Sequence, residues 1–235
     1  GETWKEITHG RVVWDENLCV QCDTCIRVCP SHTSPKVRRM SAEDVWKEIE
    51  KNMPFIQGIT VSGGECTLYP EFLTELFQRA GEAGLTCFLD SNGCVDLSRY
   101  PRLMQVTDKV MLDVKAWDHD VFRRLTGGDV SIVKKNLKYL AERGKLFEVR
   151  LVCLDSENRG ENQQEWVPEV DMEAVIVGVS REAAPYLREF RLKLITFRKY
   201  GVTGRLKDME SPPRERMEEL KSLAARCGFQ DIQVV

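Results

Sequence analysis

The sequence predicts an α/β protein of the parallel barrel type, preceded by a small cysteine-rich segment. Three observations lead to this prediction. Strand and helix patterns alternate from residue 41 onward, polar residues follow the body of each predicted strand, and four cysteines crowd into residues 19–29. Strands that alternate with helices form parallel sheets with right-handed crossovers. In a parallel barrel the carboxyl ends of the strands share one face, which carries the chemistry.

The alternating part starts with a helix over residues 41–53, where Ser41 and Asp44 form a capping signal. A helix begins at Pro70, and another runs over about 130–143 and stops at Gly144. A last helix covers 214–228. Between these helices the predicted strands are 58–65, 85–93, 109–117, 147–154 and 192–201.

Composition sets limits on function. The 235 residues can bury one sizeable core, the formal net charge is -3, and no block of like charge runs for five residues. This balance argues against nucleic acid or an anionic membrane as the main partner. No apolar run approaches the roughly 20 residues that span a bilayer. The chain begins with glycine rather than methionine, so we expect it to start inside a longer reading frame.

The cysteine run "CVQCDTCIRVCP" has the spacing and closing proline of a bacterial-ferredoxin [4Fe–4S] ligand set. Structural zinc is the alternative, although it usually takes two separated pairs. Such close spacing disfavours disulfides and favours a reducing, cytoplasmic and oxygen-sensitive protein. In two-cluster ferredoxins the fourth cysteine of a run serves the other cluster, whose own run is absent here. The predicted metal ligands are Cys19, Cys22, Cys25 and Cys29.

The remaining five cysteines are scattered along the chain. We predict that most of them are small buried apolar residues. They are Cys66, Cys87, Cys94, Cys153 and Cys227.

Polar residues at five strand ends form the candidate site. We predict that they converge on one mouth, as strand ends do in a parallel barrel. They are Ser62, Gly63, Gly64, Glu65, Asp90, Ser91, Asn92, Asp113, Lys115, Arg150, Arg198 and Lys199.

Each of these groups has an ordinary structural alternative. The two glycines permit close backbone approach to a ligand and the glutamate can bind an ammonium group, or the segment is a plain turn. Asp90, Ser91 and Asn92 could cap the following helix instead of touching a cofactor. Asp113 and Lys115 point to the same face of one strand and could form a plain salt bridge.

The motifs taken together carry a family resemblance. The cysteine run, "GITVSGGE", "LDSNG", "MLDVKAW", "LTG", "LAERGKL" and "LITFRKYGVTG" follow one another in this order. The chain thereby resembles the glycyl-radical-enzyme activating enzymes of the radical S-adenosylmethionine (SAM) superfamily, and most closely the YjjW-type branch with a ferredoxin-like insert. The resemblance implies a partial (β/α)6 barrel over residues 41–235, here lacking its first strand. Residues 1–40 would be the second half of the ferredoxin-type insert.

The resemblance also implies an activity. In this family SAM bound to a [4Fe–4S] cube is cleaved reductively to methionine and a 5′-deoxyadenosyl radical, which takes hydrogen from a glycine of a partner glycyl-radical enzyme. A flavodoxin- or ferredoxin-type reductant supplies the electron. Carried over to this sequence, Gly63, Gly64 and Glu65 would hold the SAM amino group, Asp90 and Asp113 would lie around its methionine carboxylate, and Arg150 would lie near the sulfonium. Ser62, Ser91 and Asn92 are counted among the cofactor contacts. Asp113 and Lys115 would meet the partner's glycine loop.

Three departures from the family pattern are visible. The C-x3-C-x2-C run that holds the SAM-binding cube is absent, which implies a chain truncated at its N-terminus and inactive by itself. Arg198, included among the cofactor contacts, stands where the family generally has a histidine. The loop over residues 155–165 is unusually polar. The alternative is a non-catalytic iron–sulfur electron carrier or partner-binding protein on a degenerate barrel.

Overall fold

The structure is a computed structural model that describes residues 6–7, 11–12, 14–29, 33–154, 169–200, 202, 206 and 209–235. The chain divides into two compact units, residues 1–41 and 42–235. The polar loop predicted over 155–165 lies outside the described residues.

The first unit is small and has little core. Strands β1 (Glu6–Ile7) and β2 (Arg11–Val12) pair antiparallel, and a single turn of helix, α1 (Thr24–Val28), follows. None of its described side chains, in residues 14–29 and 33–41, is buried. A small unit whose described residues bury no side chain commonly draws on another source of stability, such as a bound metal. Its assignment as a ferredoxin-type segment stays a prediction.

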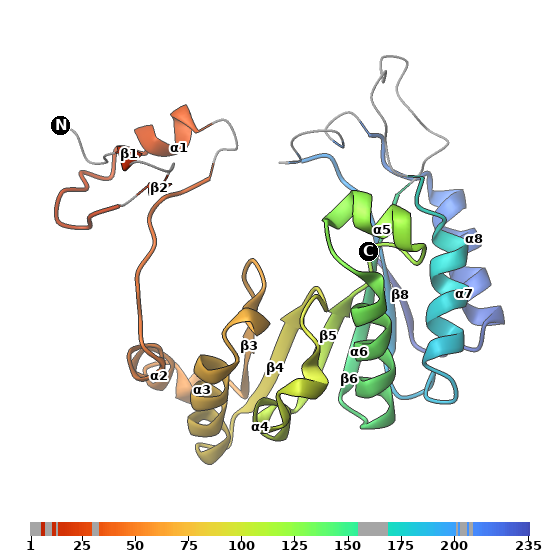
Figure 1. Ribbon diagram of the computed structural model, residues 1–235, viewed down its shortest axis with the longest axis horizontal. Coiled ribbons are helices and arrows are strands. Elements are labelled where there is room, and N and C mark those ends of the chain that lie inside the picture. The colour runs from red at the N-terminus through yellow and green to blue at the C-terminus, as the bar shows by residue number, and fades with distance from the viewer. Residues whose placement is uncertain are drawn as a thin grey trace. The chain divides into compact units, whose positions relative to one another are not determined.

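The second unit contains a six-stranded sheet in which every pair of neighbours is parallel. The strand order follows the chain, so each crossover connects adjacent strands, and the two edge strands are not paired with each other (Figure 1). The predicted α/β fold with an open, partial barrel is therefore confirmed. The strands are β3 (Gly58–Val61), β4 (Thr86–Ser91), β5 (Lys109–Asp113), β6 (Leu146–Cys153), β7 (Arg191–Thr196) and β8 (Ile232–Val234).

Helices connect these strands and pack beside one another in chain order, as Figure 1 shows for α6, α7 and α8. Three short 3-10 turns interrupt the connections: η1 (Met53–Phe55), η2 (Cys66–Leu68) and η3 (Leu97–Arg99). The helices of the second unit are α2 (Ala42–Glu50), α3 (Pro70–Glu82), α4 (Pro101–Val106), α5 (His119–Thr126), α6 (Val130–Glu142), α7 (Met172–Glu182) and α8 (Arg214–Arg226).

Among the α-helices and strands of the second unit, the sequence did not predict α4, α5, α7 and β8. α4 has six residues and β8 has three, and elements this short show no clear periodicity of hydrophobic residues. α7 has a nearly continuous apolar run, "AVIVGV", which hides the helical repeat because most of the helix is buried.

Alternation along the strands shows which face is covered. In β4, Cys87 and Leu89 are fully buried while Phe88 and Asp90 stay partly exposed. β5 and β7 follow the same pattern. One face of the sheet therefore forms the apolar core with the helices, and the other face carries the less buried side chains.

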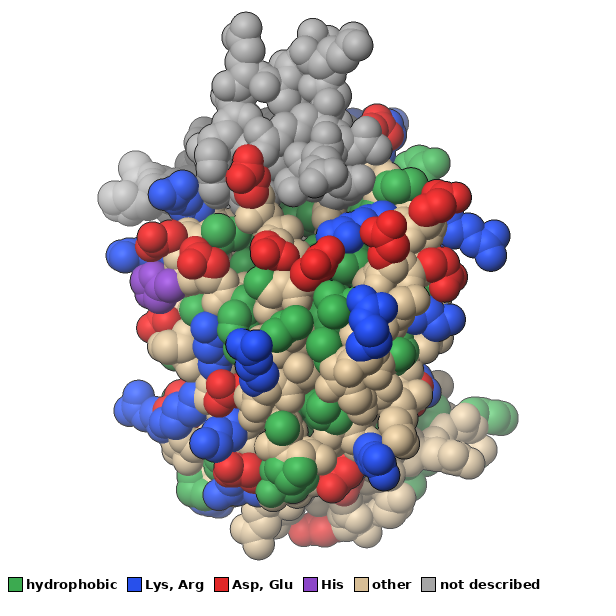
Figure 2. All heavy atoms as spheres, turned by 90° about the vertical axis from the view of Figure 1, so that its right-hand side faces the viewer, with side chains coloured by type: hydrophobic (Ala, Val, Ile, Leu, Met, Phe, Trp, Pro, Cys, Tyr) green, Lys and Arg blue, Asp and Glu red, His purple; other side chains and the backbone are tan. Residues whose placement is uncertain are grey.

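Figure 2 shows one side of the molecule, on which acidic, basic and hydrophobic side chains are interspersed. No continuous patch of one charge covers this side. Among the described helices, none combines the length and the apolar character that crossing a bilayer would require.

Candidate functional site

The segment after β3 forms a tight turn around Glu65. Gly63 has a φ of 146°, which favours glycine, and a Cβ atom added at Gly63 or Gly64 would meet nothing within 4 Å. The Glu65 carboxylate accepts hydrogen bonds from the Thr67 amide (3.1 Å) and the Thr67 hydroxyl (2.5 Å), and so caps η2. The turn thus holds a carboxylate still beside open space, while Ser62 lies exposed at the strand end.

The end of β4 completes the shell around the same carboxylate. The buried Ser91 hydroxyl donates to Glu65 Oε1 (2.9 Å), and the Asn92 amide donates to Glu65 Oε2 (2.7 Å). Capping of the next helical turn, the alternative for Asp90, Ser91 and Asn92, is not their role. That turn, η3, is capped by Asp96.

Arg150 on β6 joins the two neighbouring strands. Its guanidinium pairs with Asp90 at the end of β4, and its Nε donates to Asp113 Oδ1 at 2.9 Å. Asp113 also accepts from Lys115 Nζ at 2.7 Å. Burial lowers the pKa of Arg150, but the hydrogen bonds and charges of the two aspartates outweigh it and raise the pKa overall. The Arg150 guanidinium is therefore always charged, and it holds the carboxylates of Asp90 and Asp113 together.

These contacts place the candidates of four adjacent strands at one edge of the sheet. The cluster runs from Glu65 through Ser91 and Asp90 to Arg150 and Asp113. The salt bridge that was the alternative for Asp113 and Lys115 does form. Because Lys115 keeps about a third of its side chain exposed, the pair is still open to a partner.

Two predicted site residues after β7 are not joined to this cluster. Arg198 is exposed after β7, and no hydrogen bond among the described residues links it to the other candidates. The neighbouring Lys199 pairs with Glu210 (3.0 Å).

The four cysteines of the N-terminal run lie in the first unit. Within the part of the chain that the structure describes, no three histidine, cysteine or acidic side chains are gathered as metal ligands would be. Cys22 and Cys29 instead contact the hydroxyls of Thr24 (3.3 Å) and Thr33 (3.2 Å). Their role as iron–sulfur ligands stays a prediction from spacing.

Three of the scattered cysteines are buried as predicted. Burial raises the pKa of Cys66 and of Cys87 to about 11 and that of Cys153 to about 12, so these thiols stay protonated near neutral pH. Cys94 is exposed and Cys227 half-buried, so the prediction does not extend to them.

Sequence reasoning missed several supporting residues. Thr67 donates to Glu65 twice, and Asn136, fully buried on α6, bonds the loop after Asn92 through Gly93, Val95 and Leu97. A polar residue inside the apolar stripe of a predicted helix is the signal that could have marked Asn136.

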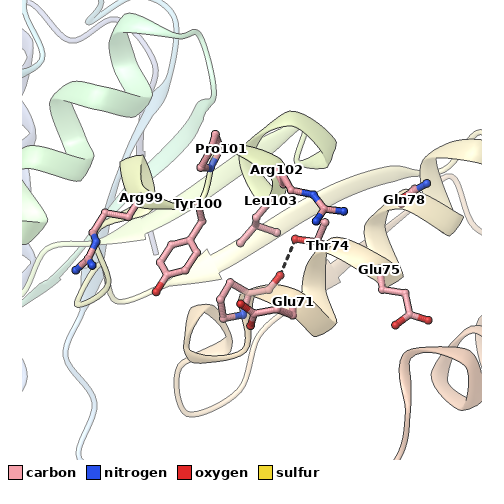
Figure 3. A pocket seen from close by; sticks show the side chains of 10 residues that line it. Glu71, Thr74, Glu75, Gln78, Arg99, Tyr100, Pro101, Arg102 and Leu103 are labelled. Atoms are coloured by element: carbon pink, nitrogen blue, oxygen red, sulfur yellow. Dashed lines mark hydrogen bonds between the residues drawn. The ribbon is translucent and has the colours of Figure 1, made fainter.

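A cavity of about 440 Å³ lies apart from the cluster, between α3 and α4 (Figure 3). Figure 3 shows Glu71, Thr74, Glu75 and Gln78 of α3 across from Arg99 and Tyr100. None of its ten lining residues is a predicted site residue, so the cavity does not define the candidate site.

The geometry around Glu65 fits a ligand with an ammonium group. Among the described residues, the hydrogen-bond donors to Glu65 are all neutral, so no cation compensates its charge. Gly63 and Gly64 leave room beside it. An ammonium group placed there would gain a charge-assisted hydrogen bond.

Comparison with known proteins gives consistent matches. Residues 17–164, more than half of the chain, match the radical SAM superfamily. The chain is 31% identical to a pyruvate formate-lyase-activating enzyme of Streptococcus mutans, over 78% of this chain and 72% of that protein. It is 24% identical to the trans-4-hydroxy-L-proline dehydratase activating enzyme of Clostridioides difficile, over 93% and 83% respectively. A domain of a pyruvate-formate lyase-activating enzyme from Bacteroides vulgatus shares the fold, with a TM-score of 0.58 and 19% identity over 76% of this chain and 98% of that one.

Proposed function

The chain belongs to the radical SAM superfamily and, within it, to the glycyl-radical-enzyme activating enzymes, and from this premise we propose that it activates a glycyl-radical enzyme by abstracting hydrogen from a glycine of that partner. The superfamily uses a [4Fe–4S] cluster and SAM. When bound, these groups supply a 5′-deoxyadenosyl radical, which is the species that takes the hydrogen atom.

The Glu65 turn supports a role in holding SAM. Its carboxylate is fixed by four neutral donors from two strand ends, so it is oriented before any ligand arrives. An acceptor that needs no reorganisation binds an ammonium group with less entropic cost. Gly63 and Gly64 let the backbone approach that ligand closely.

The observation that carries the proposal is the Arg150 bridge. It ties Asp90 and Asp113, from strands β4 and β5, into one rigid group beside the Glu65 turn. We assign Asp90, Asp113 and Arg150 to the polar end of SAM, together with Ser91 and Asn92, which position Glu65. Asp113 and Lys115, at the outer end of the same group, are assigned to the partner's glycine segment.

The iron–sulfur ligands are assigned on spacing alone. The run that contains Cys19, Cys22, Cys25 and Cys29 suits a ferredoxin-type cluster that passes electrons onward. A flavodoxin- or ferredoxin-type protein is the reductant that we propose. Reduced thiols at this spacing and the near balance of charge support a cytoplasmic protein whose partners are neither nucleic acids nor membranes.

The test uses the protein expressed from the full reading frame that contains these residues. After anaerobic reconstitution with iron and sulfide, dithionite should produce methionine and 5′-deoxyadenosine in equal amounts. Arg150→Met should lower this rate at least about 10-fold, because two neighbouring carboxylates lose the cation that holds them. Arg188→Met, in the exposed loop before β7, should not change it. Absence of SAM cleavage by the unmodified protein would refute the proposal.

A further inference from the structure

Trp117 lies two residues beyond Lys115, in the connection between β5 and α5. The intervening Ala116 and the preceding Val114 are each only 1% exposed, so both are anchored in the core. Two residues span at most about 7 Å of chain. Trp117 and Lys115 are therefore close neighbours along the backbone, with only the buried Ala116 between them.

One face of the Trp117 indole rests on Gly178 of α7. A Cβ atom at position 178 would lie 2.2 Å from Cε2, 2.3 Å from Cδ2 and 2.4 Å from Nε1 of that ring. Contacts this short do not occur between real atoms, so only glycine permits the packing. Gly178 costs the helix roughly 1 kcal/mol relative to alanine, and the contact with Trp117 gives a reason for it.

The other contact to the ring comes from α6. Lys134 Nζ lies 4.5 Å from the Trp117 ring centroid, which is a cation–π distance. Two helices that do not carry any predicted site residue thus fix the same side chain.

The ends of the connection are also fixed. The Val114 amide donates to the Arg150 carbonyl at 3.0 Å, which extends the sheet by one residue. Asp118 caps α5 by accepting from the amides of Asp120 and Val121, each at 2.9 Å. Between these anchors Lys115 is the residue whose polar group stays partly exposed, with Asp113 as its ion-pair partner.

We propose that Trp117, which contacts Gly178 and Lys134, is a positioning residue that holds the Lys115 ammonium for the partner's glycine segment. The inference rests on the proposed function and adds to it. It assigns partner recognition to a contact with α6 and α7 that lies outside the SAM-binding cluster.

The first measurement needs neither cofactor nor partner. Acylation of lysines by an amine-reactive reagent, followed by mass spectrometry, reports how tightly each ammonium is held. Gly178→Ala should displace the indole and speed the labelling of Lys115 about fivefold or more, with Lys138 unchanged. Gly81→Ala on α3 is the matched control, because a Cβ there meets nothing within 4 Å.

The second measurement uses the protein from the full reading frame with a peptide that copies the radical-bearing glycine segment of a pyruvate formate-lyase. Gly178→Ala should raise the KM for the peptide about 10-fold and leave SAM cleavage without peptide within twofold. Lys134→Met should act in the same direction more weakly, and the exposed Lys138→Met should have no effect.

Each result of these two measurements either supports or overturns the proposal. Faster Lys115 labelling with a raised peptide KM supports the proposal. Unchanged labelling of Lys115, or an equal loss of SAM cleavage without peptide, overturns it, since the contact would then serve general stability. An unmodified protein that cleaves SAM but whose peptide KM is insensitive to Gly178→Ala also overturns it. Failure of the unmodified protein to cleave SAM refutes the proposed function itself, and the positioning role with it.

Discussion

Two turns of this molecule have nearly the same structure and very different surroundings. After β3 the chain runs Glu-Cys-Thr-Leu-Tyr-Pro from residue 65, and after β4 it runs Asp-Leu-Ser-Arg-Tyr-Pro from residue 96. In each, the carboxylate accepts from the amide (3.1 Å) and the hydroxyl (2.5 Å) of the residue two positions later. A 3-10 turn, a tyrosine and a proline at the first helical turn follow in both.

The difference lies in what meets the carboxylate. Among the described residues, Glu65 receives only neutral donors, from Thr67, Ser91 and Asn92, and it lies beside the open space at the two glycines. Asp96 pairs with Lys135 of α6 at 2.7 Å. One turn therefore presents an uncompensated negative charge at the candidate site, while the same turn after the next strand is neutralised.

This difference shows that the geometry of the turn alone does not create a ligand-binding site. The backbone geometry and the capping hydrogen bonds are shared, so they explain how the carboxylates are held. The uncompensated charge of Glu65 explains what it can bind, because an ammonium group placed there would form a charge-assisted hydrogen bond.

The largest expected effect is on the free energy of unfolding, and it concerns the hydrogen bonds that attach the second turn to α6. Asn136 is fully buried, donates to the carbonyls of Gly93 (2.9 Å) and Val95 (2.7 Å), and accepts from the Leu97 amide (2.9 Å). Asn136→Ala leaves these groups unsatisfied and should lower the free energy of unfolding by about 3 kcal/mol, measured by urea denaturation. Lys138→Ala on the same helix is the control. A loss below about 1 kcal/mol would show that the turn after β4 is held by other contacts.

The next effect tests the two carboxylates directly. Glu65→Gln keeps the shape of the side chain but removes its charge, and should weaken SAM binding about 100-fold, the range expected for a hydrogen bond to a charged group. Asp96→Asn, the matched change in the second turn, should alter it less than twofold. Calorimetric titration with SAM measures both. Equal losses for the two variants would mean that the difference in surroundings has no functional meaning.

The candidate residues of the first turn could be predicted from the sequence, because their position at the ends of strands determines where they lie in the fold. Glycines and carboxylates after apolar strands converge at one edge, so Glu65, Asp90 and Arg150 could be placed together without coordinates. Sequence reasoning also assigned Ser91 to the cofactor, which stays a prediction; in the structure the Ser91 hydroxyl donates to Glu65.

The residues that sequence reasoning missed depend on contacts between distant segments. Asn136 is about 40 positions from the loop that it holds, and Trp117 and Gly178 are about 60 apart. No local periodicity encodes such a pair. The similarity of the two turns was readable as the repeated pattern acid-x-hydroxyl-x-Tyr-Pro, but the lysine that distinguishes them comes from a helix about 39 residues later.

The smallest effect concerns that lysine and appears only in acid. The hydrogen bond from Lys135, with help from Ser98, lowers the pKa of Asp96 below its ordinary value. The unfolded chain therefore takes up this proton at a higher pH, near 3.9, than the folded protein does. The stability that the pair contributes is complete above that pH and is lost as the pH falls through the lower, folded pKa.

Lys135→Met should consequently cost about 0.2–1 kcal/mol at pH 7, as for a partly exposed ion pair. The difference from the unmodified protein should shrink as the pH falls below about 4, and also in 1 M salt, which screens exposed charges. Urea denaturation at several pH values measures this, with Lys138→Met as the control. A difference that stays constant from pH 7 into strong acid would mean that Lys135 acts through packing of its aliphatic chain. In that case the charge of Asp96 would be as uncompensated as that of Glu65, and the contrast between the turns would have to rest on the open space at the glycines alone.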